Sequence, residues 1–429
     1  MMVHKRDGRT VSFEREKIVQ AVLKAFNDVD GEITPEARRK AVDIAASIES
    51  LNKDFEVEEI QDLVEDKLMA SRRKDVARTY IIYRNHRSLD RERNSKFMKI
   101  VGEKLMASNV QNQNANVDEH SFGGRKGEAN SELMRKYALD YVMSDLAKER
   151  HLNNEIYTHD LDSYAIGMHN CLSVPFDKLL ANGFNTRQTD VRSAQSINTA
   201  FQLVAVIFQL QSLQQFGGVS ATHLDWTMVP YVRKSFRKHY LDGMTYCVTI
   251  HDAEWQDSYN TIVNSKNNEL PIEDDLYKKY KNAYVYANDM TNKELYQAVQ
   301  GLYHNLNTLQ SRSGNQLPFT SINYGTCILP EGRLVIKALL DCSIEGVGKL
   351  HKTPIFPCGI FQCAKGINRE PRDPNYDLFK LALKSTSQRL YPNYANVDWS
   401  GNAGYDKNDP KTYFSTMGLD NVLSSYKTF

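Results

Sequence analysis

The chain has 429 residues, 41% hydrophobic and 25% charged, so it can form about two to four globular domains with buried cores. Lysine and arginine (54) nearly balance aspartate and glutamate (53), and the formal charge of +1 excludes a protein that binds nucleic acid or anionic membranes through its net charge. The longest apolar run, Phe201 to Leu210, is shorter than the ~20 residues of a membrane-spanning helix, and no apolar stretch follows the basic N-terminus, so we expect a cytoplasmic protein without membrane or nucleic-acid partners.

The chain is expected to begin with a basic hairpin. Val3 and the strand formers at 11–13 lie on either side of Asp7-Gly8, a dipeptide that suits a type I′ turn. Lys5, Arg6 and Arg9 surround this turn, and Lys17 follows on the next segment. These cations and the backbone N–H groups of the turn are suited to hold a triphosphate; the alternative is a solvated charged surface.

A small helical domain over residues 1–95 is predicted behind this hairpin. Ser12 is expected to cap a helix that starts at Glu14, and Thr34-Pro35 carries the cap and first-position proline of a second helix. Apolar stripes at helical spacing predict a third and a fourth helix: Val57, Ile60, Val64 and Leu68, then Val76, Tyr80 and Tyr83.

Residues 96–130 are expected to connect this domain to the rest of the chain. The stretch Asn109 to Glu128 is polar and amide-rich, contains Gly123-Gly124 and shows no hydrophobic period. Beyond it, long helices alternate with short β-rich runs, which predicts an α/β domain, either an open sheet or a barrel. The runs are Cys171 to Pro175, Pro318 to Asn323 and Thr353 to Phe361.

Polar residues precede the first β-rich run. His159, Asp160 and Asp162 lie before Cys171, which is expected to begin a buried strand. The three polar side chains lack the helical spacing of a zinc motif, so a polar network is favoured over a metal site. A buried cysteine is more often inert than nucleophilic, and nothing nearby in the sequence lowers the pKa of its thiol.

Two further features concern packing. The segment Ser196 to Phe216 is predicted to be a long helix that ends at Gly217-Gly218, with a wide apolar face that is either core or a subunit interface. Cys358 and Cys363 lie five residues apart in a β-like run and are interpreted as structural, on opposite faces of a strand. The six cysteines form no C-x-x-C pair, so neither a disulfide scaffold nor a zinc site is expected.

Nearly the whole chain resembles the class III anaerobic ribonucleoside-triphosphate reductases. The first part resembles their ATP-cone through Lys5 to Arg9, Lys17, Val57 to Met69 and Val76 to Arg84. The later part resembles the N-terminal portion of their catalytic α/β barrel. That similarity is carried by Asn112 to Asp118, His159 to Cys171, Gln214 to Gly218, Asn307 to Thr326, Thr353 to Phe361, Asp373 to Leu378 and Phe414 to Gly418.

The resemblance implies radical chemistry on ribonucleoside triphosphates. In this family a radical-SAM activase generates a glycyl radical, a finger-loop cysteine receives it as a thiyl radical, and a second cysteine helps to reduce the ribose, commonly with formate as electron donor. Cys171 matches that second cysteine, which makes it the expected catalytic residue. The cone match implies that Val3, Lys5, Arg6 and Lys17 contact ATP or dATP. The helix ending at Gln214 to Gly218 lies where the family forms its dimer interface and its deoxynucleotide specificity site.

The similarity stops at Gly418, where the family continues into the thiyl cysteine and this chain continues with Leu419. Residues 131–418 are therefore expected to be part of the barrel and 419–429 an unrelated tail, without the thiyl cysteine, the zinc site or the glycyl-radical motif. From this we expect a truncated reductase, inactive alone and produced by an intron, a split gene or a frameshift. Three interpretations of such a chain remain open: an enzyme component that a C-terminal fragment completes, a non-catalytic nucleotide-binding fragment, or an unfolded product. A cone-bearing transcription regulator fits less well, because no basic DNA-binding surface is expected from the sequence.

Overall fold

The computed structural model describes residues 1–5, 8–93, 96–106, 117–118, 120–167, 171–265, 270–312, 314–398, 406 and 409–413. The chain divides into two compact units, Met1–Gly102 and Glu103–Phe429, which are described separately. Helix α5, Lys96–Met106, runs across the point of division.

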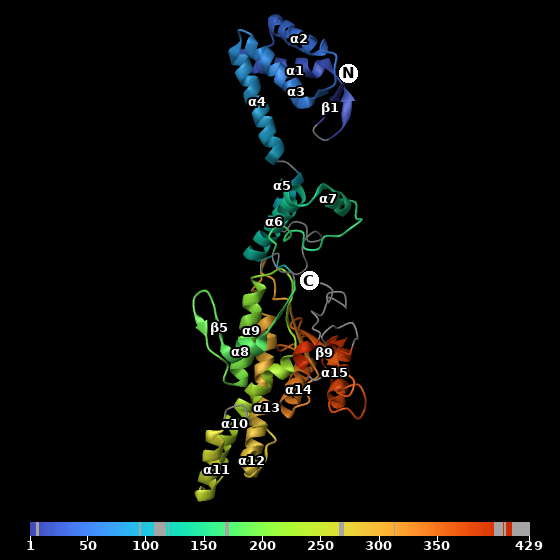
Figure 1. Cartoon of the computed structure of the whole chain (residues 1–429). Helices are drawn as coiled ribbons and strands as arrows, with labels where there is room; N and C mark the ends of the chain where they lie inside the picture. Colours follow the sequence, from blue (N-terminus) through green and yellow to red (C-terminus); the bar gives the residue numbers. More distant parts are fainter. Residues whose placement is uncertain are drawn as a thin grey trace. The chain divides into compact units, whose positions relative to one another are not determined.

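The first unit combines four helices with a three-stranded sheet (Figure 1). Its elements are β1 Met2–His4, β2 Thr10–Ser12, α1 Arg15–Asp30, α2 Pro35–Glu49, β3 Phe55–Glu56, α3 Val57–Ala70 and α4 Lys74–Arg93. The central strand β1 pairs antiparallel with β2 and parallel with β3, so that Val3 lies opposite Val11 on one side and Phe55 on the other. The predicted helical domain behind a hairpin is therefore confirmed.

The helices of this unit follow the local signals with one exception. The Thr34 hydroxyl accepts a hydrogen bond from the Ala37 N–H at 3.1 Å and Pro35 occupies the first turn of α2, as predicted. Ser12 does not cap α1, however, because it is the last residue of β2, opposite Met2. Glu14 takes the cap position of α1 without a side-chain hydrogen bond.

The hairpin connection is longer than the predicted two-residue turn. Lys5 and Arg9 close it, with the Lys5 N–H donating to the Arg9 carbonyl at 2.8 Å. The Gly8 N–H donates back to the Lys5 carbonyl at 2.9 Å, and Gly8 has a φ of +80°, the left-handed conformation that closes three-residue hairpin loops. Arg6 and Asp7 lie outside the described residues.

The second unit alternates helices with short strands, as expected for an α/β domain. Its helices are α6 Phe122–Tyr137, a π-helix at Ala138–Val142, α7 Asp145–Leu152, α8 Phe176–Asn182, α9 Ile197–Ser212, α10 Leu224–Cys247, α11 Ala253–Asn264, α12 Asp275–Lys278, α13 Lys281–Leu306, α14 Pro330–Glu345, α15 Tyr376–Arg389 and a 3-10 turn at Pro410–Thr412. Its strands are β4 Leu172–Val174, β5 Phe184–Asn185, β6 Asp190–Val191, β7 Val219–Ala221, β8 Thr320–Tyr324, β9 Cys358–Cys363 and β10 Asn393–Asn396.

A five-stranded parallel sheet forms the centre of this unit. The strand order is β10-β9-β8-β7-β4, and each neighbouring pair is parallel. The three predicted β-rich runs contribute β4, β8 and β9. All residues of β7 and β8 are buried, as is usual where helices cover both faces of a parallel sheet. The fold class predicted from the sequence, a helical domain followed by an α/β domain, is confirmed; the described strands form an open sheet with β4 and β10 at its edges.

Three long helices pack side by side next to this sheet. In Figure 1, α9, α10 and α13 run together, and Glu294 of α13 ties them by accepting hydrogen bonds from Ser235 of α10 and the Asn198 N–H of α9. Ser196 caps α9. The predicted end of this helix at Gly217-Gly218 is wrong: α9 stops at Ser212, and the two glycines lead into β7.

Part of the segment expected to be a connecting loop is helical. Ser121 caps α6 by accepting the Gly124 N–H at 2.9 Å, so Gly123 and Gly124 lie inside the first turn of a helix. Residues 109–116 lie outside the described part of the chain. Glycines of α6 allow close packing against another segment: a Cβ on Gly127, for example, would come within 2.6 Å of Gly314 Cα.

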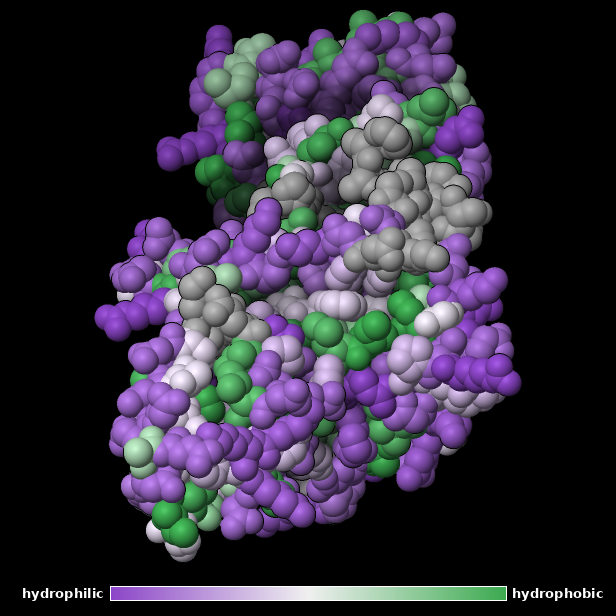
Figure 2. All heavy atoms as spheres, turned by 60° about the horizontal axis from the view of Figure 1, so that its bottom comes forward, coloured by the Kyte–Doolittle hydropathy of each residue, from purple (hydrophilic) through white to green (hydrophobic). Residues whose placement is uncertain are grey.

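No helix in the described part of the chain combines the length and apolarity needed to cross a membrane. The face in Figure 2 is mainly hydrophilic, and its apolar side chains gather in small separate groups.

Candidate nucleotide and thiol sites

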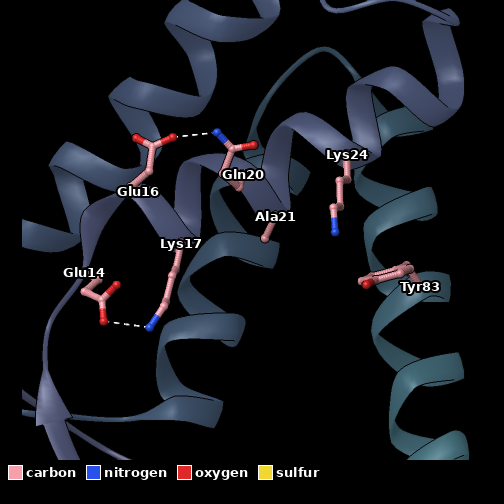
Figure 3. Close-up of a pocket in the computed structure, with 7 residues that line it drawn as sticks. All are labelled: Glu14, Glu16, Lys17, Gln20, Ala21, Lys24 and Tyr83. Atoms are coloured by element: carbon pink, nitrogen blue, oxygen red, sulfur yellow. Dashed lines mark hydrogen bonds and ion pairs between the residues drawn. The ribbon is translucent and has the colours of Figure 1, made fainter.

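A shallow hollow of about 300 Å³ lies on helix α1 in the first unit. Figure 3 shows that α1 supplies most of its lining and that Tyr83 reaches it from α4. The lining residues are Glu14, Glu16, Lys17, Gln20, Ala21, Lys24 and Tyr83. Two ammonium groups, an amide and an aromatic ring thus face one space of nucleotide size, a combination suited to phosphate and base.

The charges around this hollow are partly compensated. Lys17 Nζ lies 2.6 Å from Glu14 Oε1, and Gln20 Nε2 donates to Glu16 Oε1 at 2.6 Å. Both partners of the Lys17 pair are more than half exposed, so solvent screens the pair and a phosphate can replace the carboxylate at little cost. Lys24 is exposed and makes no ion pair with any residue that the structure describes.

The structure separates the four residues that the sequence singled out for nucleotide contact. Lys17 lines the hollow. The Val3 side chain is 4% exposed and packs in the core, which leaves only its backbone for a ligand. Lys5 is half-buried at the base of the hairpin connection, and Arg6 lies outside the described residues.

Sequence reasoning missed Gln20, Lys24 and Tyr83 as lining residues. Lys17, Gln20 and Lys24 recur at helical spacing opposite the buried stripe of α1 that contains Ile18 and Val22, so the polar face itself was a usable signal. The contribution of Tyr83 depends on how α4 packs on α1 and carries no local signal.

In the second unit, Cys171 lies at the amino end of the parallel sheet. It directly precedes edge strand β4, and the Gly218 N–H at the start of β7 donates to its sulfur at 3.4 Å. The sequence placed this thiol at the start of a buried strand; the structure corrects this, because β4 is an edge strand and Cys171 is exposed. An exposed thiol at the amino end of the sheet is accessible to a substrate.

Arg312 supplies a positive charge in the neighbourhood of Cys171. Its guanidinium stacks on the Phe319 ring with 3.9 Å between Cζ and the ring centroid. Burial lowers the pKa of Arg312, and the nearby groups Asp160, Cys171 and Asp162 act in the opposite direction. The sequence singled out Asp160, Asp162 and Cys171 but not the arginine, which comes from a segment far along the chain.

Two of the polar residues that precede Cys171 in the sequence contact each other. His159 Nδ1 and Asp160 Oδ2 lie 2.5 Å apart. Across the part of the chain that the structure describes, no three His, Cys, Asp or Glu side chains group together as metal ligands.

A fully buried carboxylate organises the opposite end of the sheet. Asp225 accepts hydrogen bonds from the backbone N–H groups of Gly325 (2.9 Å), Thr326 (3.1 Å) and Cys327 (2.9 Å), and from Trp226. Burial raises the pKa of Asp225, although these donors oppose the shift. The loop after β8 is therefore held in one conformation by a residue at the start of α10.

The remaining cysteines lie in less accessible places. Cys327, Cys342 and Cys358 are buried, and burial raises the pKa of each thiol, in the case of Cys342 to about 12. Cys358 and Cys363 are the two ends of β9, and burial also raises the pKa of Cys363, to about 11. These thiols are poor nucleophiles, in agreement with the structural role predicted for the β9 pair.

Comparisons with known proteins match a family model to each of the two units. Residues 1–89 match the ATP cone domain, and residues 113–419 match the anaerobic ribonucleoside-triphosphate reductase family. The anaerobic ribonucleoside-triphosphate reductase of Haemophilus influenzae is 33% identical over 401 residues, which cover 92% of this chain and 52% of that protein. The Escherichia coli enzyme of the same name is 29% identical, over 92% of this chain and 51% of its own length.

A solved anaerobic ribonucleotide reductase from Thermotoga maritima is 14% identical, with a TM-score of 0.46 over 74% of this chain and 50% of that one. The chain spans about half the length of the curated relatives that it matches. Since a family match covers most of its residues, the chain belongs to the anaerobic ribonucleoside-triphosphate reductase family, a family of oxidoreductases.

Proposed function

We propose that the chain takes part in the reduction of ribonucleoside triphosphates to deoxyribonucleoside triphosphates in the cytoplasm, and so in the supply of DNA precursors. The observation that carries this proposal is the occurrence, on one chain, of a nucleotide-binding cone and a reductase segment with Cys171 exposed at the mouth of the sheet. The domain division we propose is a cone at 1–95, a connection at 96–130, a barrel part at 131–418 and a separate tail at 419–429.

Cys171 is proposed as the cysteine that helps to reduce the ribose. Its exposure, and its position beside the Gly218 N–H, support a thiol that meets a bound substrate. A glycyl radical made by a radical-SAM activase, with formate as electron donor, supplies the radical chemistry in this family. The described residues contain no cluster that fits the family's zinc site, so no role of zinc is assigned to them.

The cone is proposed to bind ATP or dATP as the signal for overall activity. Lys17 lines the hollow on α1, and Lys5, Arg6 and the backbone of Val3 belong to the neighbouring hairpin segment of the sequence. Tyr83 offers a ring on which a base can stack. Deoxynucleotide effectors are proposed to bind the second unit separately, near the end of α9.

The assembly proposed is a homodimer or a complex with a polypeptide that carries the glycyl-radical domain. Leu210 and Leu213 at the end of α9 are 39% and 60% exposed, which supports a contact there. A symmetric contact of this kind would place the same face of both copies together.

Deoxynucleotide formation tests the proposal. The chain is incubated under anaerobic conditions with activase, formate and ribonucleoside triphosphates, once alone and once with a purified polypeptide that carries the glycyl-radical domain. Formation of deoxynucleotide in the mixture, and its loss in the Cys171→Ala variant, would support the catalytic proposal. No product in either mixture, together with intact ATP binding, would favour the alternative, a non-catalytic nucleotide-binding protein.

ATP binding is tested separately by calorimetry. The double variant Lys5→Ala/Arg6→Ala and the single variant Lys17→Ala are expected to weaken ATP binding by about tenfold or more, since each removes a charge-assisted hydrogen bond. Lys40→Ala on the exposed face of α2 is the matched control, because it removes the same charge away from the hollow. Equal affinities in all variants would place the nucleotide elsewhere.

A further inference from the structure

Arg312 is a half-buried cation with an unused donor. Its Nη1 atom is inaccessible to solvent and has no hydrogen-bond partner, and the guanidinium forms no ion pair within the described part of the chain. Phe319 covers one face of the guanidinium plane, which leaves the donor edge as the polar surface. A cation that is withdrawn from water destabilises the fold unless a partner compensates its charge.

Backbone contacts constrain the segment that carries Arg312. The Arg312 N–H donates to the Gln316 carbonyl at 3.2 Å, and Gly314 and Asn315 between them have φ values of +76° and +56°, so the chain turns tightly here. Helix α6 packs against this turn so closely that a Cβ on Gly127 would meet Gly314. The backbone at Arg312 is thus fixed by local contacts, and the guanidinium stacks on Phe319, an arrangement that suits a preorganised binding group.

The surroundings offer incomplete compensation. Asp160, Asp162 and the Cys171 sulfur are near enough to interact with the guanidinium electrostatically, but neither carboxylate forms an ion pair with it. An additional anion at the donor edge would satisfy Nη1 and would lie beside the Cys171 thiol. The planar fork of arginine fits the paired oxygens of a carboxylate or phosphate.

We propose that Arg312 forms an oxyanion-binding site next to Cys171, which takes a carboxylate or a phosphate oxygen. The site uses residues that neither the cone nor the thiol chemistry assigns. Binding to it needs no radical and no turnover, so it is measurable on the chain itself. A negative result here would leave the reductase proposal untouched, and a chain inactive in turnover would still be expected to bind the anion.

Thermal unfolding measures the binding, because a ligand that binds only the folded state raises the melting temperature with its concentration. Sodium formate is the carboxylate probe and inorganic phosphate the phosphate probe, each against sodium chloride at equal ionic strength. The variants are Arg312→Gln, which removes the cation, and Arg312→Lys, which keeps the charge but loses the fork. Arg187→Gln, at an exposed position between β5 and β6, is the matched control.

The original chain and the Arg187→Gln variant should be stabilised by formate or phosphate beyond the effect of chloride. Arg312→Gln should weaken this binding by about 10- to 100-fold and Arg312→Lys by less, as expected for hydrogen bonds to a charged group. Without added anion, Arg312→Gln should melt no lower than the original chain, since it removes a half-buried charge that has no ion pair within the described part of the chain. A response to formate alone identifies a carboxylate site and a response to phosphate alone a phosphate site. Equal responses in Arg312→Gln and the original chain, or no response to either anion, would overturn the proposal.

Discussion

The backbone N–H of Gly218 donates to the sulfur of Cys171 at 3.4 Å and so joins the amino ends of β7 and β4. Strand β4 is an edge strand of the sheet, and Cys171, directly before it, is exposed. Cys327, Cys342 and Cys358, by contrast, are enclosed by packing. The six thiols should therefore differ strongly in reactivity.

Alkylation should discriminate between these cysteines. Iodoacetamide at about pH 8 is expected to modify Cys171 at least about tenfold faster than Cys342 or Cys363, because access and thiolate fraction both control the rate. Burial raises the pKa of Cys342 to about 12 and that of Cys363 to about 11, so each has little thiolate at this pH. Peptide mass spectrometry of timed samples gives the individual rates, and Cys171→Ser should remove the fast phase. Equal rates for Cys171 and Cys342 would contradict the exposed placement of Cys171.

Local signals predicted most elements of the first unit. Thr34-Pro35 starts α2 because the cap and the proline act within one turn, and Val64 and Leu68 are buried as their spacing required. Ser12 failed as a cap because strand pairing with Met2 competes for the same residue. Such competition depends on a segment that lies elsewhere in the sequence, and capping rules alone do not contain it.

The errors in the second unit have tertiary causes. The predicted end of α9 relied on Gly217-Gly218, yet the chain leaves the helix earlier to enter β7, and the Gln215 side chain donates to the Gly218 carbonyl at 2.7 Å. Gly123-Gly124 indicated a loop, whereas a glycine face lets α6 approach residues 314–315. Lys17 was predictable from its own segment; Arg312 was not, since only the fold brings it to Cys171.

Tyr83 should contribute to nucleotide binding through its ring. If a base stacks on it, Tyr83→Ala should weaken ATP binding by about 1–3 kcal/mol, and Tyr83→Phe should bind nearly as well as the original chain. Calorimetry with ATP and with inorganic triphosphate separates base from phosphate contacts, because the triphosphate affinity should not change. A Tyr83→Ala variant with unaltered ATP affinity would remove the base from this side of the hollow.

Gly127 should tolerate no side chain. A Cβ there would lie 2.6 Å from Gly314 Cα, a backbone atom that cannot swing aside, so Gly127→Ala is expected to destabilise the second unit by about 1–3 kcal/mol. Gly301 in α13 is the matched control, because nothing lies within 4 Å of the corresponding Cβ. Gly301→Ala should stabilise by about 0.5–1 kcal/mol through helix propensity. Urea unfolding followed by circular dichroism measures the unfolding free energy of both variants. We expect this free energy to fall in Gly127→Ala and to rise in Gly301→Ala.

Glu294 should make the stability of the group formed by helices α9, α10 and α13 depend on pH. Burial raises the pKa of Glu294, but hydrogen bonds from His239 Nε2 (2.8 Å), the Asn198 N–H and Ser235 outweigh it and hold the pKa below its ordinary value of 4.5. The unfolded chain therefore binds this proton at a higher pH than the folded chain does. The contribution of Glu294 to stability is complete above about pH 4.5 and is lost as the pH falls through the lower, folded-state pKa.

Glu294→Gln tests this dependence. At about pH 7 the variant should be less stable by about 1–3 kcal/mol, because a neutral amide accepts these hydrogen bonds more weakly and its N–H₂ group opposes one of the donors. As the pH falls below about 4.5, the difference from the original chain should shrink, since protonation of Glu294 removes the same interactions. Urea unfolding at several pH values measures the difference, with Glu149→Gln on the exposed face of α7 as a matched control. A difference in unfolding free energy that stays constant down to acidic pH would show that Glu294 acts through packing and that its charge does not stabilise the contacts among α9, α10 and α13.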